Sequence, residues 1–178
     1  LKLQSNTISD TSTLAVIRQA QVRVRSMGLI HQKLYQAENF SEIDFKDYLE
    51  QLTTYVSEMY YDGIGEITCE LHISNKKFNI DTATPLGLII TELLSNSYKY
   101  AFRKGENGKI SITLKHIELN NYLLIYSDSG IGLPDTLNLE NSSTLGLELV
   151  GLLTDQLNGS IKKYNNNGAV FEIMFNPY

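Results

Sequence analysis

The stretch TPLGLIITELLSNSYKYAF, at residues 84–102, constrains this chain more than any other. Its apolar residues recur at the spacing of a helix, about 100° per residue, and this pattern predicts one long α-helix. Thr84 is expected to cap that helix, and Pro85 to take its first position, where a missing N–H does no harm. One side of the helix is expected to face the core and carries these residues: Leu86, Ile89, Ile90, Leu93, Leu94, Ser97 and Ala101.

A second side of the same helix carries polar side chains about one turn apart: Glu92, Asn96, Lys99 and Arg103. A solvated helix face usually mixes charges freely. Here a carboxylate, an amide and an ammonium group stand in one row beside the aromatic ring of Tyr100. Such a set of groups can hold a metal ion together with a polyphosphate, so the row is a candidate binding site.

The segment DSGIGLP, at residues 128–134, follows a predicted strand. A carboxylate held at the end of a strand, here Asp128, can accept a hydrogen bond from an exocyclic amino group such as that of adenine. Gly130 and Gly132 then let the backbone approach a flat ring closely. Alone, this pattern is a weak signal, because it is also common in ordinary turns after strands.

A second glycine segment, TLGLELV, opens a helix predicted at residues 144–157. Gly146 would leave amide groups near the start of this helix free for phosphate oxygens. A tight junction between loop and helix explains the same glycine equally well. The polar residues 135–144, between the two glycine segments, are expected to form a mobile lid.

The remaining elements follow from helical and alternating patterns. Further helices are expected at residues 13–36 and 45–60, and strands at residues 66–73, 78–80, 109–118, 122–127, 160–164 and 169–175. The strands at 109–118 and 122–127 should be antiparallel neighbours, because a short Asn-Asn turn joins them. The strand at 78–80 is expected to pair back on the strand at 66–73.

The helix at residues 13–36 has an apolar seam at two heptad positions, formed by Ile17, Val24 and His31 and by Ala20, Met27 and Leu34. Such a seam needs a partner helix, and residues 1–5 resemble the last turn of a preceding helix. We therefore expect residues 1–38 to form half of a helical hairpin that pairs in a dimer. His31 is expected to be packed in the seam rather than to accept a phosphoryl group.

Composition sets limits on the partners of the chain. It has 178 residues, 42% of them hydrophobic, which suits one domain plus a short accessory segment. The net charge is −5 and no basic patch interleaves with aromatic residues, so nucleic acid is not expected as a partner. No apolar run reaches about 18 residues, so no membrane contact is expected. Because the chain lacks an initial Met, we expect a fragment of a longer cytoplasmic protein, with sensors or a membrane anchor lying upstream.

In this order and spacing, the motifs resemble those of a known family. Residues 40–175 resemble the catalytic ATP-binding domain of sensor histidine kinases, in the superfamily that also holds gyrase, Hsp90 and MutL. The stretch PLGLIITELLSNSYKYAF is similar to the asparagine box, DSGIGLP to the first glycine box and TLGLELVGLLTDQLNGS to the second. Residues 1–38, with RVRSMGLIHQKLY, resemble the second half of the dimerisation hairpin of HisKA_2 kinases.

The resemblance implies an α+β fold, a two-layer α/β sandwich of the Bergerat type with a mixed, mostly antiparallel sheet. It implies two parts, a partial helical dimerisation hairpin at residues 1–38 and a catalytic ATP-binding domain at residues 39–178. The family's phosphate-accepting histidine would lie upstream of Leu1.

The resemblance also implies a role for each candidate residue. Asn96 would bind Mg²⁺, Lys99 would contact phosphates and Tyr100 would line the nucleotide pocket. Glu92 would act as a base or polarise the attacking group, and Asp128 would bind the adenine amino group. Four further residues would shape the pocket and its phosphate edge: Gly130, Gly132, Gly146 and Leu147.

Three functions are therefore considered. The first is the kinase core of a two-component sensor, which binds Mg-ATP and transfers the γ-phosphoryl group to a histidine and then to the receiver domain of a response regulator. The second is a nucleotide-binding regulator that sequesters a partner protein. The third is a gyrase- or MutL-like ATPase.

Overall fold

A computed structural model describes residues 11–36, 42–60, 65–74, 76–118, 120–134 and 145–178. In chain order its elements are α2 (Thr11–Gln36), β1 (Ile43–Asp44), α3 (Phe45–Tyr60), β2 (Ile67–Ile73), β3 (Lys77–Phe78), α4 (Ile80–Asn96), the π-helix η1 (Ser97–Ala101), β4 (Gly108–Glu118), β5 (Asn121–Asp128), α5 (Leu145–Gln156), β6 (Ser160–Asn165) and β7 (Ala169–Phe175).

Five strands form the main sheet, in the order β2-β4-β5-β7-β6. The β2–β4 pair is parallel and the three other pairs are antiparallel. The hairpin predicted from the Asn-Asn turn is confirmed, with Ile112 opposite Tyr126 in β4 and β5. The sheet is therefore mixed and mostly antiparallel, as expected.

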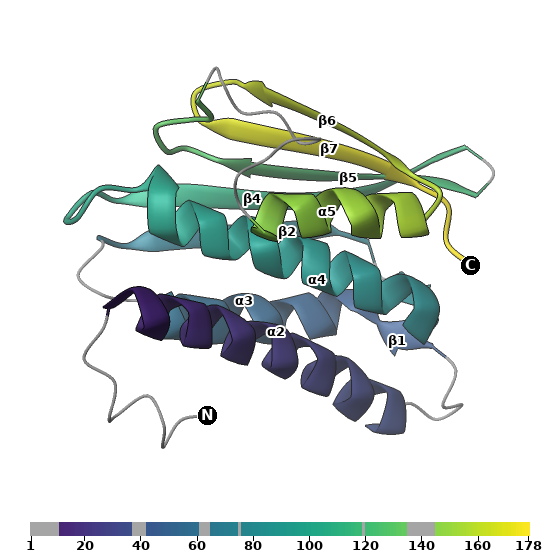
Figure 1. Cartoon of the computed structure of the whole chain (residues 1–178). Helices are drawn as coiled ribbons and strands as arrows, with labels where there is room; N and C mark the ends of the chain where they lie inside the picture. Colours follow the sequence, from purple (N-terminus) through teal and green to yellow (C-terminus); the bar gives the residue numbers. More distant parts are fainter. Residues whose placement is uncertain (1–10, 37–41, 61–64, 75, 119, 135–144) are drawn as a thin grey trace.

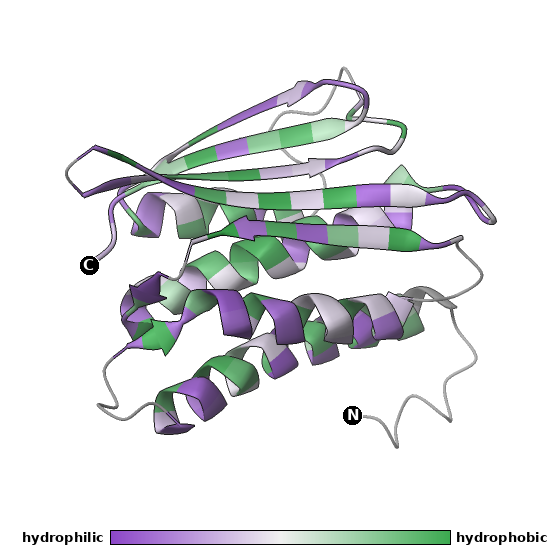
Figure 2. Ribbon diagram, turned by 180° about the vertical axis from the view of Figure 1, so that it is seen from behind, coloured by the Kyte–Doolittle hydropathy of each residue, from purple (hydrophilic) through white to green (hydrophobic). Residues whose placement is uncertain are grey.

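Helices α3, α4 and α5 cover one face of this sheet (Figure 1). The strands alternate in hydropathy (Figure 2), and their apolar side chains turn toward the helices; those of β4 and β5 are Ile110, Ile112, Leu114, Tyr122, Leu124 and Tyr126. This is the predicted two-layer α/β sandwich. Helix α2 lies outside it, packed on α3 and α4. Among the described helices, none is both long and apolar enough to cross a bilayer.

The central helix α4 begins earlier than the sequence predicts. Its cap is Asn79, whose side-chain oxygen accepts a hydrogen bond from the Thr82 amide at 3.0 Å. The prediction of Thr84 as cap was wrong, and Pro85 lies inside the helix. Proline removes one intrahelical hydrogen bond there. The observed start of the helix is stabilised by the Asn79 cap and by the acidic Asp81 in the first turn.

The pairing predicted for the strand at residues 78–80 was also wrong. Lys77 and Phe78 form β3, which pairs antiparallel with β1 instead of with β2. The Phe78 ring meets Phe45 at 5.3 Å and Tyr122 at 5.5 Å, both edge to face. This aromatic cluster draws β3 toward the start of α3.

Helix α2 does not bury its heptad seam within this chain. Its fully buried side chains are Val22, Ser26, Leu29 and Ile30, which pack toward α3 and α4. Val24 and Met27 in the seam are 59% and 40% exposed. His31 is also exposed within this chain, and its packing in the seam against a partner helix stays a prediction. Pairing of the seam with another helix stays a prediction.

Candidate functional site

Asp128 ends β5 and lies against η1, with 7% of its surface exposed. Its Oδ2 accepts a hydrogen bond from Ser97 Oγ at 2.6 Å. Its Oδ1 accepts from the backbone amides of Gly130 at 3.0 Å and Ala169 at 3.2 Å. A carboxylate has about four acceptor positions. These three bonds therefore fix its orientation and leave capacity for one more donor.

Ser97 connects this carboxylate to the core. The Tyr126 hydroxyl donates to Ser97 Oγ at 2.8 Å, so the bonds run from Tyr126 through Ser97 to Asp128. Burial raises the pKa of Tyr126 well above its usual value, which keeps this hydroxyl protonated and able to donate. In the sequence, Ser97 falls on the apolar side of the helix, and that pattern does not predict this role. Its signal was available, because a serine among core residues needs a hydrogen-bond partner.

Gly130 marks the closest approach of the DSGIGLP segment to the end of η1. A Cβ at Gly130 would lie 2.4 Å from both the Cβ and the carbonyl oxygen of Ala101. The next amide, of Ile131, donates to that same carbonyl at 3.0 Å. Any side chain at position 130 would therefore push the segment away from the helix.

Gly132 lies farther along this segment, in a turn whose backbone is hydrogen-bonded by Asn165 of β6. Its φ of +80° is the left-handed conformation that glycine adopts without strain. Asn165 closes the turn, accepting from the Leu133 amide at 2.7 Å and donating to the Leu133 carbonyl at 3.0 Å. Asn165 was not predicted from the sequence, because nothing there distinguishes it from the other asparagines of the Asn165-Asn166-Asn167 turn.

The start of α5 packs against Glu92 near the end of α4. A Cβ at Gly146 would lie 2.7 Å from Glu92 Oε2, and Leu147 beside it is 6% exposed. Glycine here brings the first turn of α5 next to the polar row of α4, and Figure 1 shows the two helices side by side. The predicted lid, residues 135–144, lies outside the described residues.

Glu92 is fully buried, and its partners come from α2. Arg23 binds it with two nitrogens, Nε to Oε1 at 2.5 Å and a terminal nitrogen to Oε2 at 2.8 Å. Gln19 Nε2 donates to Oε2 at 2.8 Å. The hydrogen bond to Glu92 raises the pKa of Arg23. Gln19 and Arg23 were not predicted from the sequence, because polar residues on a long helix follow the same pattern whether they face water or a buried charge.

The other members of the polar row stand near Glu92 on the last turns of α4 and on η1. Lys99 Nζ donates to Gln19 Oε1 at 3.1 Å and lies 5.6 Å from the ring centre of Tyr60. Burial lowers the pKa of Lys99, and Glu92 partly opposes that shift. Asn96 is half-buried, directly before Ser97 in the chain. Tyr100 points outward and is 63% exposed.

The predicted residues thus fall into two groups at one end of α4. Asp128 and Gly130 meet Ser97 and Ala101. Gly146 lies against Glu92, and both Glu92 and Lys99 are hydrogen-bonded to Gln19 of α2. Asn96 joins the two groups in the chain, one residue before Ser97. Arg103 lies beyond η1 and does not continue the row as a helical residue.

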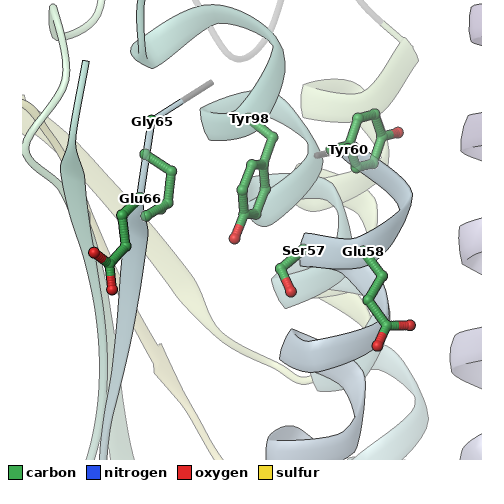
Figure 3. A pocket seen from close by; sticks show the side chains of 7 residues that line it. Ser57, Glu58, Tyr60, Gly65, Glu66 and Tyr98 are labelled. Atoms are coloured by element: carbon green, nitrogen blue, oxygen red, sulfur yellow. The ribbon is translucent and has the colours of Figure 1, made fainter. Parts of the chain in front are cut away.

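A separate pocket of about 410 Å³ lies between the end of α3, the start of β2 and η1 (Figure 3). Tyr98 points into it from η1, facing Ser57 and Glu66. Burial raises the pKa of Tyr98 to about 12. Among the described residues that line this pocket, none is a predicted site residue.

In the described part of the chain, no three or more His, Cys, Asp or Glu side chains lie close enough together to hold a metal ion. On the polar row, the half-buried Asn96 carries an amide that could supply an oxygen ligand to a metal. Mg²⁺ suits such a site, since it keeps several waters and binds few protein groups.

Two sequence families match the chain. Residues 81–178 match the family described as Histidine kinase-, DNA gyrase B-, and HSP90-like ATPase, and residues 1–60 match the HisKA_2 histidine kinase family. The sensor histidine kinase PdtaS of Mycolicibacterium smegmatis is 30% identical over 169 residues, covering 90% of this chain and 32% of the relative. The chain thus spans about a third of the length of this relative. The blue-light-activated histidine kinase 2 of Erythrobacter litoralis is 22% identical over 78% of this chain and 41% of its own length.

The fold has solved relatives. The histidine kinase domain of a blue-light-activated kinase from Erythrobacter litoralis superposes with a TM-score of 0.78 at 20% identity, covering 89% of this chain and 75% of that one. The catalytic domain of histidine kinase ThkA superposes with a TM-score of 0.56 at 22% identity, covering 77% of this chain and 95% of that one. The family match at residues 81–178 contains Glu92, Asn96 and Asp128. The chain belongs to the family of histidine kinase-, DNA gyrase B- and HSP90-like ATPases, with a HisKA_2 region before its ATPase domain.

Proposed function

We propose that this chain is the catalytic core of a two-component sensor histidine kinase and binds Mg-ATP at the end of α4. One observation carries this proposal. The buried carboxylate of Asp128 accepts a hydrogen bond from Ser97, and Ser97 directly follows Asn96 in the chain. A nucleotide at this place would have a base acceptor and a metal ligand on the same edge of the helix.

The base would lie at Asp128. The remaining acceptor capacity of the carboxylate suits the amino group of adenine, and a guanine ring would present an oxygen acceptor at the corresponding position. Gly130 brings backbone close to this place without a side chain in the way. Gly132 and Tyr100 complete the proposed pocket, Gly132 at the turn held by Asn165 and Tyr100 from the exposed side of η1.

The phosphates would lie along the rest of the row. Asn96 would offer its amide oxygen to Mg²⁺, which neutralises phosphate charge when bound. Lys99 would contact the phosphates, and the glycine-opened start of α5, with Gly146 and Leu147, would bring backbone amides near them. Glu92 would polarise the attacking group.

Calorimetric titration with ATP tests this assignment. We expect Asn96→Ala to remove the part of the affinity that depends on Mg²⁺, because the metal loses its only side-chain ligand from the helix. Asn166→Ala is the matched control, since Asn166 is an exposed asparagine of the β6–β7 turn. Unchanged affinity of Asn96→Ala in the presence of Mg²⁺ would contradict the metal assignment.

The partners belong to the same proposal. Residues 1–38 would form part of a dimerisation hairpin and residues 39–178 the ATP-binding domain, in a cytoplasmic kinase that dimerises through α2. The exposed apolar seam of α2, with Val24 and Met27, supports pairing with another helix. The receiver domain of a response regulator would take the phosphoryl group from a histidine upstream of Leu1. Phosphorylation of His31 in this chain, lost in His31→Ala, would contradict that order.

A gyrase- or MutL-like ATPase shares the nucleotide site but releases phosphate continuously. We expect this chain to turn over ATP slowly, because a kinase transfers the phosphoryl group to a histidine rather than to water. Sustained phosphate release at the rate of a dedicated ATPase would favour that alternative.

A further inference from the structure

The pocket between α3, β2 and η1 takes no part in the proposed nucleotide site. Its volume of about 410 Å³ lies in the range of pockets that hold small molecules. Much of its wall is apolar or aromatic, formed by the rings of Tyr60 and Tyr98 and the side chain of Ile67. A ligand with a small apolar body fits such a wall.

The polar group at the centre of this pocket is the hydroxyl of Tyr98. Tyr98 is only 6% exposed, and its hydroxyl points into the space between α3 and β2 (Figure 3). Among the described residues, Ser57 is its one hydrogen-bonding neighbour. Ser57 donates its own proton to the Thr54 carbonyl at 2.7 Å, so it meets Tyr98 as an acceptor. Lone pairs on both hydroxyl oxygens thus remain available to an N–H donor in the pocket.

Two carboxylates on different walls give the pocket a negative potential. Glu58 comes from α3 and Glu66 lies directly before β2, and both are exposed. Their carboxylates point away from Tyr98 (Figure 3), so they act on a ligand at a distance rather than by direct contact. No Lys or Arg among the described residues pairs with either of them, and the described lining has no basic residue. These charges favour a cation over an anion.

The pocket is connected to the polar row of α4 through two aromatic rings. Tyr98 stacks on Tyr60 with ring centres 6.1 Å apart, and the Lys99 ammonium group lies 5.6 Å from the centre of the Tyr60 ring. Tyr98 also stands between Ser97 and Lys99 in η1, and Ser97 is hydrogen-bonded to Asp128. A ligand that contacts Tyr98 therefore stabilises η1 in the arrangement that orients Asp128.

We propose that this pocket binds a small primary ammonium ion with an apolar body, oriented by Tyr98 and Ser57, and that its binding raises the affinity of the chain for Mg-ATP. The ammonium group donates to the two hydroxyl oxygens, and the apolar body packs against Tyr60 and Ile67. The effect on ATP rests on the proposed function, whereas the binding of the amine does not. The coupling is reciprocal, because both ligands favour the same arrangement of η1.

Chemical shifts of backbone amides test the site directly. The probe is 2-phenylethylammonium chloride, and 2-phenylethanol is its uncharged control, with a hydroxyl in place of the ammonium group. We expect the amine to shift the amide signals of Ser57, Ile67 and Tyr98, and to bind about fivefold more tightly than the alcohol. Shifts confined to other parts of the chain, or equal affinities of the two probes, would overturn the proposal.

Variants of the lining identify the contacts. Tyr98→Phe keeps the ring and removes the hydroxyl, and we expect amine affinity to fall about tenfold, because a hydrogen bond to a charged donor is lost. Tyr122→Phe is the matched control, since Tyr122 is another buried tyrosine, 7% exposed, in β5. Equal amine affinities of these two variants would contradict the contact with Tyr98.

The charge of the pocket is tested separately, at two exposed positions that leave the core intact. We expect Glu58→Gln/Glu66→Gln to weaken binding of the amine but not of the alcohol. Thermal melts show whether each variant folds, and this double variant decides the proposal if Tyr98→Phe does not fold. Unchanged amine affinity in the double variant would overturn the preference for a cation.

Calorimetry with both ligands tests the link to the nucleotide. We expect saturating 2-phenylethylammonium to tighten binding of Mg-ATP about fivefold, and saturating Mg-ATP to tighten binding of the amine by the same factor. Tyr98→Phe should reduce both effects together. An ATP affinity that does not change with the amine would overturn the regulatory role. Failure of the parent chain to bind ATP would instead refute the proposed function, and the amide shifts would still decide whether the amine binds here.

Discussion

The hydroxyl of Ser97 lies 2.6 Å from Asp128 Oδ2, and this contact joins the end of the central helix to the end of β5. These residues are 31 positions apart in the chain. The bond sets the distance between the carboxylate proposed to bind adenine and the amide proposed to bind Mg²⁺.

Removing Ser97 Oγ should cost stability because the buried Tyr126 hydroxyl loses its acceptor and Asp128 loses one of its three donors. We expect Ser97→Ala to lower the free energy of unfolding by about 1–3 kcal/mol, since Tyr126 loses its acceptor and Asp128 loses a donor. Tyr126→Phe should cost about 1 kcal/mol. Urea unfolding of both single variants and the double variant measures the coupling; the double variant should lose less than the sum, and strict additivity would contradict the chain of bonds.

Gly146 should tolerate no side chain. We expect Gly146→Ala to lower the free energy of unfolding by about 1–3 kcal/mol, because its Cβ would lie 2.7 Å from Glu92 Oε2. Gly151→Ala is the matched control in the same helix, with no atom within 4 Å of its Cβ. The control should gain up to about 1 kcal/mol from higher helix propensity. Equal effects in the two variants would show that α5 does not press on Glu92.

Asp128→Asn should weaken ATP binding roughly tenfold to a hundredfold, a loss of about 1.4–2.8 kcal/mol. The amide is a weaker acceptor for the adenine amino group and cannot serve all three present donors. Asp155→Asn, at an exposed position of α5, is the control. Calorimetry measures both, with thermal melts confirming that each chain folds. An unchanged ATP affinity in a folded Asp128→Asn chain would show that the adenine ring binds elsewhere.

Stability should fall at alkaline pH because tyrosines are buried. Burial raises the pKa of Tyr98 to about 12 from 10.0 in the unfolded chain. Between these values the unfolded chain releases a proton that the folded chain keeps, so ionisation favours unfolding and stability decreases as pH rises. Tyr98→Phe should make the free energy of unfolding less steep in pH over this window, measured by urea unfolding at a series of pH values. An identical slope in the variant would mean that Tyr98 ionises freely in the folded state.

The local patterns settled much of the fold by themselves. Apolar spacing placed the central helix and its buried side, and alternation placed β4 and β5 as a hairpin, because these features depend on neighbours in the chain. The two glycine segments and the row of Glu92, Asn96 and Lys99 were visible for the same reason. The start of α4 was missed because Thr84-Pro85 mimics a helix start, whereas Asn79 forms the actual cap.

Only the tertiary structure decided which long-range partners these groups find. The strand that contains Phe78 pairs with β1 rather than with β2, because three aromatic rings from distant segments pack around Phe78. Ser97 is hydrogen-bonded to Asp128, and Gln19 and Arg23 are hydrogen-bonded to Glu92. The residues that flank them in the sequence do not predict these contacts. A buried polar group must find a partner to offset its lost hydration, but which partner depends on how distant elements pack.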